Sequence, residues 1–172
     1  FVAYKFAAAN ATLVLSARRE GRLRDVLKHC LQLGASPDST IEPLDVAAAL
    51  PQMSHVVEQV VGRTKRLDVL VLNAGATQRS LAVDMPLSKV RELFELNVFA
   101  VIEHARAAVP HMALLPRAQI IVTSSFTGKL GTPISAAYSA TKHALHGYFG
   151  GLRAEEQNID ITMICPGPVA SE

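Results

Sequence analysis

Tyr138 and Lys142 lie four residues apart in a segment with helical character, and their side chains could together perform acid–base chemistry. Residues at this spacing on a helix lie on the same face, one turn apart. A free tyrosine has a pKa of about 10, but an adjacent ammonium stabilises the phenolate and lowers that pKa. Such a pair makes the tyrosine usable as a general acid or base. Taken alone, the pair fits an exposed tyrosine and a solvated lysine better, because Y-x-x-x-K often arises by chance.

A serine pair supplies the context for these two residues. Ser124 and Ser125 end an expected strand, fourteen and thirteen residues before Tyr138. Ligands of a parallel sheet bind at the carboxyl ends of its strands. A hydroxyl at that place could hold a carbonyl or alcohol oxygen beside the tyrosine hydroxyl. The other interpretation is a serine pair that ends a strand or begins a turn.

The elements that must position these side chains alternate along the chain. We expect strands at residues 12–17, 40–44, 69–73, 119–124 and 160–165, with helices at 1–9, 20–33, 52–66, 88–111 and 135–157. The third and fourth strands are continuous apolar runs, which is typical of central parallel strands. Pro43 places the second at a sheet edge or a strand terminus. The order predicts a single α/β domain over residues 1–172, a Rossmann-like doubly wound parallel sheet with helices on both faces.

Composition narrows the class of protein. Of 172 residues, 49% are hydrophobic and 19% charged, which suits a sheet buried on both faces, and the net charge is +2. No basic block stands out, so we expect no nucleic-acid partner. Two distant cysteines, Cys30 and Cys165, favour a reducing compartment over a disulfide framework. No apolar run long enough for a bilayer and no signal peptide is visible.

Several motifs together are similar to one family. The run VTSSFTGKLGTPISAAYSATKHAL at residues 122–145 resembles the catalytic segment of the classical short-chain dehydrogenase/reductases. NAG at 73–75, Asn97 in LFELNVFA and PGPV at 166–169 match further motifs of that family, in its order and approximate spacing. The details SARR, TKHAL and CPGPV look most like its hydroxysteroid-dehydrogenase-like "dehydrogenase/reductase member" branch.

The resemblance implies four catalytic residues. Tyr138 would be the general acid/base, and Lys142 would lower its pKa and bind the nicotinamide ribose hydroxyls. Ser125 would orient the substrate oxygen; it is preferred to Ser124 because the family's serine usually lies thirteen positions before the tyrosine. Asn97 would hold a water in a proton relay through Lys142. Alternatively, Asn97 marks a buried helix kink with its side chain bonded to a backbone carbonyl.

The resemblance also implies residues that line the cofactor. A glycine at 75 leaves no Cβ to block an approaching ribose, although a simple strand-to-loop turn would also explain it. Asp45 would lie at the adenine amino group, or cap the following helix, or both. Ser171 stands where the family often has a phosphate-binding threonine. The implied cofactor contacts are Ser16, Arg18, Arg19, Asp45, Val46, Asn73, Ala74, Gly75, Tyr138, Lys142, Pro166, Gly167, Val169 and Ser171, and no metal ligand is expected.

The end of the strand at 12–17 predicts which cofactor is used. NAD enzymes carry an acidic residue there for the ribose hydroxyls, and this chain has Ala17. Arg18 comes next, and its guanidinium suits a 2′-phosphate in bidentate fashion. We therefore predict NADP(H) in preference to NAD(H), with assistance from Ser16. An ordinary basic helix start is the alternative, and it would oppose the helix dipole.

One family motif, the glycine-rich turn T-G-x-x-x-G-x-G that binds pyrophosphate, is absent from the sequence. We expect that turn and the first strand before Phe1, and a substrate loop after Glu172, so the sequence is expected to be incomplete at both ends. It predicts hydride transfer between NADP(H) and a carbonyl or secondary alcohol, without naming the substrate. Alternatives are a catalytically silent family member that senses dinucleotide or acts as a scaffold, and another Rossmann-like enzyme such as a methyltransferase. The latter explains neither Y-x-x-x-K nor NAG.

The resemblance further implies a homodimer or homotetramer that pairs through the helices at 88–111 and 135–157. It implies a small-molecule carbonyl or alcohol as substrate. The expected location is cytoplasmic, or the endoplasmic reticulum membrane if an anchor precedes the sequence.

Overall fold

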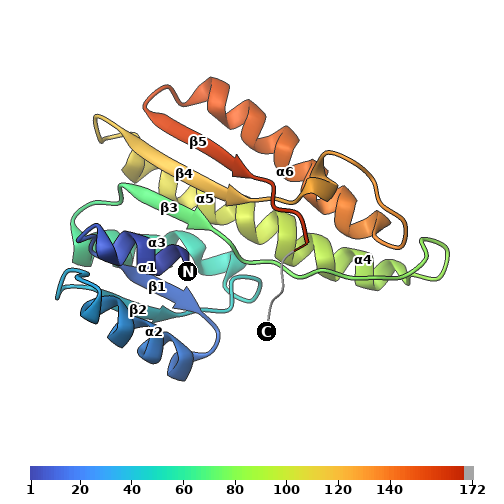
Figure 1. Cartoon of the computed structure of the whole chain (residues 1–172). Helices are drawn as coiled ribbons and strands as arrows, with labels where there is room; N and C mark the ends of the chain where they lie inside the picture. The colour runs from blue at the N-terminus through green and yellow to red at the C-terminus, as the bar shows by residue number, and fades with distance from the viewer. Residues whose placement is uncertain (169–172) are drawn as a thin grey trace. The chain divides into compact units, whose positions relative to one another are not determined.

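The computed structural model describes residues 1–168, and the chain divides into two compact units, Phe1–Ala49 and Leu50–Glu172 (Figure 1). Each unit has its own parallel β-sheet packed against helices. The expected single domain over residues 1–172 stays a prediction. No helix within residues 1–168 has the length and apolar character needed to cross a bilayer.

The first unit is a two-stranded parallel sheet with two helices. Its elements in order are α1 (Val2–Ala8), β1 (Val14–Ala17), α2 (Glu20–Gln32) and β2 (Thr40–Pro43). Ala7, Cys30 and Ala35 form its buried core, and burial raises the pKa of the Cys30 thiol. Pro43 ends β2, as predicted, and the ladder bond at this end is donated by the Leu44 N–H to the Ala17 carbonyl, so the missing N–H of Pro43 interrupts no ladder.

Helix α2 begins and ends for local reasons. Glu20 in its first turn complements the positive end of the helix dipole. After the last residues, Gly34 adopts a φ of +104°, a conformation that residues with side chains rarely adopt. Its N–H donates to the Leu31 carbonyl and the Ala35 N–H donates to the Cys30 carbonyl. This pair of bonds is a Schellman motif, which turns the chain toward β2.

The second unit is a three-stranded parallel sheet in the order β3-β4-β5. Its elements are η1 (Leu50–Gln52), α3 (Met53–Thr64), β3 (Val69–Leu72), α4 (Leu87–Phe94), η2 (Glu95–Phe99), α5 (Ala100–Met112), β4 (Ala118–Thr123), η3 (Phe126–Gly128), α6 (Ala136–Glu155) and β5 (Ile159–Ile164). Helix α5 packs against β3, and α6 packs against β5 (Figure 1). In β4, Ala118, Ile120 and Val122 are buried and their neighbours are half-buried, so one face of this sheet carries most of the core.

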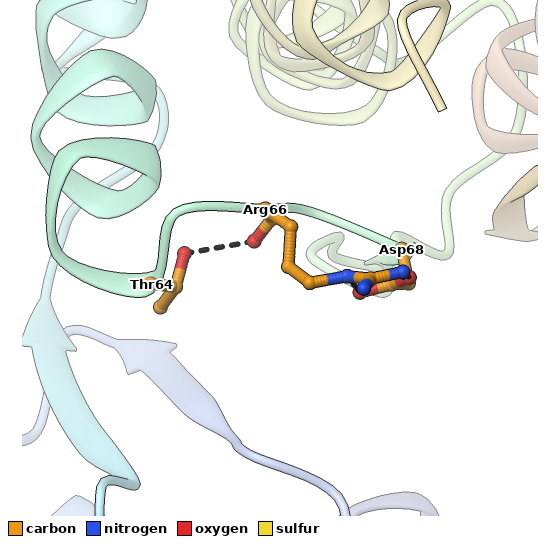
Figure 2. Close-up of polar contacts among 3 residues, drawn as sticks. All are labelled: Thr64, Arg66 and Asp68. Atoms are coloured by element: carbon orange, nitrogen blue, oxygen red, sulfur yellow. Dashed lines mark hydrogen bonds and ion pairs between the residues drawn. The ribbon is translucent and has the colours of Figure 1, made fainter. Parts of the chain in front are cut away.

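The connection from α3 to β3 is held by short-range polar contacts, shown in Figure 2. Lys65 ends α3 in the left-handed region with a φ of 66°. The Thr64 hydroxyl donates to the Arg66 carbonyl at 2.8 Å, and the Arg66 guanidinium binds the Asp68 carboxylate in bidentate fashion. The Asp68 carbonyl accepts from the Gln119 N–H at 2.8 Å. These contacts set the point at which β3 joins β4.

One expected helix differs from the structure. The pattern over residues 88–111 predicts a continuous helix, but α4 and α5 are separated by η2, a π-helical turn. A π turn inserts an extra residue into the helical spiral and re-aims the side chains beside it. The inserted turn contains Asn97, which is fully buried.

Candidate active site

The carboxyl ends of β3 and β4 are joined by side-chain bonds. Because Leu72 pairs with Val122 across these strands, Asn73 and Thr123 lie next to each other. The Thr123 hydroxyl donates to Asn73 Oδ1 at 2.9 Å. Lys142 Nζ from α6 donates to the Thr123 carbonyl at 2.8 Å. The lysine that the spacing singled out is therefore attached to the sheet edge where ligands of this fold bind.

Lys142 is the buried charge of this site. It is only 4% exposed, and burial lowers its pKa from an ordinary 10.5 to about 8. Its Nζ lies 5.7 Å from the centroid of the Tyr138 ring, within the range of a cation–π contact. The helical spacing thus does bring Tyr138 and Lys142 together as predicted.

Asn97 anchors the loop that comes after β3. Its Oδ1 accepts from the Ala76 N–H at 2.8 Å, and its Nδ2 donates to the Ala76 carbonyl at 2.9 Å. Nδ2 also donates to the Thr141 hydroxyl at 3.2 Å, and that hydroxyl donates to the Tyr138 carbonyl at 2.7 Å. These bonds match the alternative interpretation of Asn97, in which it marks a buried irregularity of the helix and its side chain binds a backbone carbonyl. The water-holding role of Asn97 stays a prediction.

Replacing Asn97 with alanine should lower the free energy of unfolding by about 1–3 kcal/mol, because the Ala76 N–H and C=O would lose their partner. Urea denaturation measures the difference. Asn158→Ala is the control, since Asn158 is exposed and a surface change should stay within about 0.5 kcal/mol. Equal stability of the two variants would contradict this role.

Gly75 lies against two of the predicted catalytic residues. A Cβ at this position would lie 3.1 Å from Asn97 Oδ1 and 3.6 Å from Lys142 Nζ. The first distance is tighter than ordinary van der Waals contact, so a side chain would displace the Asn97 amide. The sequence suggests that position 75 is glycine because a ribose approaches it. The structure adds a second reason, which is the close contact with Asn97 Oδ1. Gly75, Asn97 and Lys142 therefore form one contiguous group.

Ser125 begins the turn that comes after β4. Its Oγ accepts from the Thr127 N–H at 3.2 Å, and the residue is 7% exposed. This is the cap expected for a serine that begins a turn, and it leaves the hydroxyl hydrogen free to donate elsewhere. Segment η3 packs against α6, so the serine turn adjoins the helix of Tyr138 and Lys142.

The loop before α6 is tied to the loop after β3. The Ser80 N–H donates to the Ile134 carbonyl at 2.9 Å. Ile134 has a φ of 56°, which is disfavoured for a β-branched residue. It lies two residues before Ala136, where α6 begins, so the contact ties the start of that helix to the loop after β3.

The turn after β5 reaches the same sheet edge. The Pro166 carbonyl accepts from the Phe126 N–H at 3.0 Å, directly beside Ser125. The structure thus places Pro166 near the serine turn, with Gly167 next in the chain. The predicted contacts Val169 and Ser171 lie outside the described residues.

The predicted adenine-side residues belong to the first unit. Ser16, Arg18 and Arg19 are exposed at and after the end of β1, and Arg19 precedes α2 without a side-chain cap bond. Asp45 Oδ1 accepts from the Ala47 N–H at 3.1 Å. Asp45 therefore caps a turn and not the helix that was expected, because α3 begins only at Met53. Val46, next to it, is half-buried.

Sequence reasoning missed His146. Its Nε2 lies 3.0 Å from Ser124 Oγ and 3.6 Å from Cys165 Sγ. The available signal was periodicity, since His146 lies four residues after Lys142 and eight after Tyr138 on one helix face. Thr123 and Thr141 lie inside the run at residues 122–145 but were missed, because their spacing alone assigns them no chemical role. The Thr123 carbonyl accepts from Lys142, and the Thr141 hydroxyl accepts from Asn97.

Known proteins resemble this chain along its whole length. The family described as "short chain dehydrogenase" matches residues 1–172. "Dehydrogenase/reductase SDR family member 7" of Homo sapiens is 37% identical over 99% of this chain and 51% of that protein. "11-beta-hydroxysteroid dehydrogenase A" of Sesamum indicum is 36% identical over 99% of this chain and 49% of that protein. The chain thus spans about half the length of these curated relatives.

Solved structures agree on the fold. A short-chain dehydrogenase from Streptomyces avermitilis is 32% identical, with a TM-score of 0.88 over 99% of this chain and 62% of its own. The NADP-bound protein ElxO is 26% identical, with a TM-score of 0.90 over 99% of this chain and 69% of its own. The parallel sheets flanked by helices are thus a Rossmann-like fold, as predicted. The chain belongs to the short-chain dehydrogenase/reductases, a family of oxidoreductases that use nicotinamide dinucleotides, and within it to the hydroxysteroid-dehydrogenase-like branch.

Proposed function

We propose that the protein transfers a hydride between NADP(H) and a carbonyl or secondary alcohol, with Tyr138 as general acid/base. The observation that carries the proposal is the placement of Lys142, buried at the sheet edge with its Nζ 5.7 Å from the Tyr138 ring centroid. A buried lysine costs stability, and proteins keep such groups mostly at functional sites. The nicotinamide supplies or accepts the hydride, and this chain's residues bind, orient and move the proton.

The donors of Lys142 fit a nicotinamide ribose. An ammonium has three N–H donors, and within the described residues one of them is used by the Thr123 carbonyl. The remaining two suit a pair of ribose hydroxyls. A Cβ on Gly75 would lie 3.6 Å from Lys142 Nζ. Because glycine has no Cβ, the ribose can come close to the backbone after β3. We propose Asn73, Ala74, Gly75, Pro166 and Gly167 as further contacts at this end of the cofactor.

The proton moves at the Tyr138 hydroxyl. In the reductive direction Tyr138 donates its proton to the substrate oxygen, and the Lys142 ammonium stabilises the phenolate that remains. Ser125, whose Oγ already accepts from Thr127, donates its hydroxyl hydrogen to the same substrate oxygen. Asn97 holds the loop at Ala76 in place and, in this proposal, a water that returns the proton through Lys142.

Two measurements test the function on the intact protein. Enhanced NADPH fluorescence on mixing reports binding, and oxidation of NADPH with a panel of ketones, steroid ketones included, reports turnover. The steroid ketones are chosen because the Sesamum indicum relative is named an 11-beta-hydroxysteroid dehydrogenase. Binding together with turnover supports the enzyme. Binding without turnover of any ketone would favour the silent, dinucleotide-sensing alternative.

Cofactor preference rests on the end of β1. Ala17 offers no carboxylate to the ribose hydroxyls, and the exposed Arg18 offers a guanidinium to a 2′-phosphate. Ser16 adds a hydroxyl at the same strand end. We propose Arg19, Asp45 and Val46 as further contacts at the adenine end of NADP(H).

Arg18→Asp should lower the ratio of kcat/KM for NADPH to kcat/KM for NADH by about 10- to 100-fold. A charge-assisted bond contributes about 1.5–3 kcal/mol, and 1.4 kcal/mol corresponds to tenfold. Steady-state kinetics with both cofactors gives the ratio. Lys28→Asp makes the same change of charge at an exposed position of α2 and should leave the ratio unchanged. An unchanged ratio in Arg18→Asp would exclude this assignment.

We also propose a homodimer or homotetramer that pairs through α6 and the helical segment formed by α4, η2 and α5. Phe99 is 48% exposed before α5, and a Cβ at Gly147, Gly150 or Gly151 of α6 would meet open space within the described residues. These features leave room for a second copy. The proposed location is the cytoplasm, or the endoplasmic reticulum membrane through an anchor outside this sequence. Sedimentation velocity of the intact protein measures the oligomeric state.

A further inference from the structure

His146 joins three elements of the second unit at one point. It lies on α6, and its Nε2 is 3.0 Å from Ser124 Oγ at the end of β4. The same nitrogen is 3.6 Å from Cys165 Sγ, just after β5. The helix that carries Tyr138 is thereby bonded to the strand end that carries Ser125, the next residue after Ser124.

The contact between His146 and Ser124 is closely packed. Ser124 is 2% exposed. A Cβ on Gly128 would lie 2.7 Å from Ser124 Oγ and 3.1 Å from two atoms of the His146 ring. Gly128 closes the same turn η3 in which Ser125 Oγ accepts from the Thr127 N–H. The ring, Ser124 and the serine turn therefore move together, because packed interiors leave little room for independent shifts.

The surroundings of His146 favour a hydrogen bond made by the uncharged imidazole. Burial lowers the pKa of its imidazole, and the positive charges of Lys129, His143 and Arg153 lower it further. A neutral ring offers one donor and one acceptor nitrogen, and a serine hydroxyl can complement either. The bond to Ser124 is thus compatible with both tautomers near neutral pH.

We propose that His146 is a positioning residue, which holds Ser124 and so fixes the Ser125 hydroxyl relative to Tyr138 on α6. The inference rests on the proposed function of Ser125 and Tyr138. A misplaced orienting hydroxyl costs rate more than binding, because substrate geometry matters most in the transition state. His146 itself contacts neither the substrate nor the cofactor in this proposal.

Kinetics on the intact protein separates positioning from general support of the fold. His146→Ala should lower kcat at least tenfold and leave the dissociation constant of NADPH within about twofold. His146→Gln should restore most of kcat, because its amide can reach Ser124 with either a donor or an acceptor. Ser124→Ala should lower kcat similarly, and adding His146→Ala to it should cost little more. His55→Ala, an exposed histidine on α3, is the control.

Hydrogen exchange gives a readout that needs no turnover. The Thr127 amide donates to Ser125 Oγ, so its exchange rate reports how often the turn that begins at Ser125 opens. Its exchange should be at least tenfold faster in His146→Ala and near the parent rate in His146→Gln. Parent-like exchange and parent-like kcat in His146→Ala would overturn the inference, as would equal losses of kcat and NADPH binding that glutamine does not rescue. If the parent binds NADPH but turns over no ketone, the proposed function fails, and the exchange rates still decide whether His146 holds the turn.

Discussion

Replacing Tyr138 with phenylalanine should lower kcat by about 10²- to 10⁴-fold, the usual contribution of a positioned general acid or base. The change removes one hydroxyl and keeps the ring, which lies 5.7 Å from Lys142 Nζ. Both the packing of the ring and its contact with the ammonium survive. Affinity for NADPH should therefore stay within about twofold, and stopped-flow turnover together with NADPH fluorescence measures the two effects separately.

Tyr148 provides the matched control for this experiment. It lies on the same helix and packs edge-on against Phe149, and burial raises the pKa of its phenol. A raised pKa makes it a poorer proton donor than a free tyrosine near neutrality. Tyr148→Phe should keep parent turnover. Ketone reduction that survives in Tyr138→Phe would show that another group moves the proton.

Replacing Lys142 with methionine should abolish turnover and at the same time stabilise the fold. The pKa of this lysine falls from 10.5 to about 8 through burial, a destabilisation on the order of 3 kcal/mol for the charged form. Methionine fills a similar volume without a charge. Losing the charge-assisted bond to the Thr123 carbonyl offsets much of the gain, by about 1.5–3 kcal/mol. The free energy of unfolding should therefore rise by up to about 1.5 kcal/mol at pH 7.

The pH dependence of stability identifies Lys142 as the source. Below pH 8 the residue is protonated in both the folded and the unfolded chain, so the cost of burying its charge is fully present. Between about pH 8 and 10.5 the unfolded chain binds a proton that the folded chain has released, so this residue makes stability increase with pH. Lys142→Met should lack that increase.

Urea denaturation of both proteins at pH 7, 8, 9 and 10 tests this prediction, since those values run from below the lower pKa of about 8 almost to the upper pKa of 10.5. Lys89→Met is the control, because Lys89 is an exposed residue of α4 paired with Glu92 and should change stability little. A Lys142→Met protein that is less stable than its parent at pH 7 and keeps the parent's pH dependence would contradict the prediction.

The sequence by itself determined the features that depend on local geometry. The spacing of Tyr138 and Lys142 places them one helical turn apart in any α-helix, and the structure brings them together. The expected strands and helices are present, with ends that differ by one or two residues for most of them, except that a π turn divides the helix expected over residues 88–111. Strand ends depend on ladder bonds to a neighbour, which the pattern of one segment does not contain. The family motifs supplied the order of the remaining site residues along the chain.

Only the tertiary structure decided how distant segments meet at the site. Asn97 binds the backbone of Ala76, 21 residues away, and it does so from a π turn that no periodicity predicted. Gly75 lies against Asn97 and Lys142, and His146 binds Ser124 from 22 residues away. Such contacts depend on how loops close and side chains pack between elements, which neither helical spacing nor strand pattern specifies. The sequence therefore named the residues that we propose carry the chemistry, and the packing of sheet edge, π turn and helix decided which other side chains hold them in place.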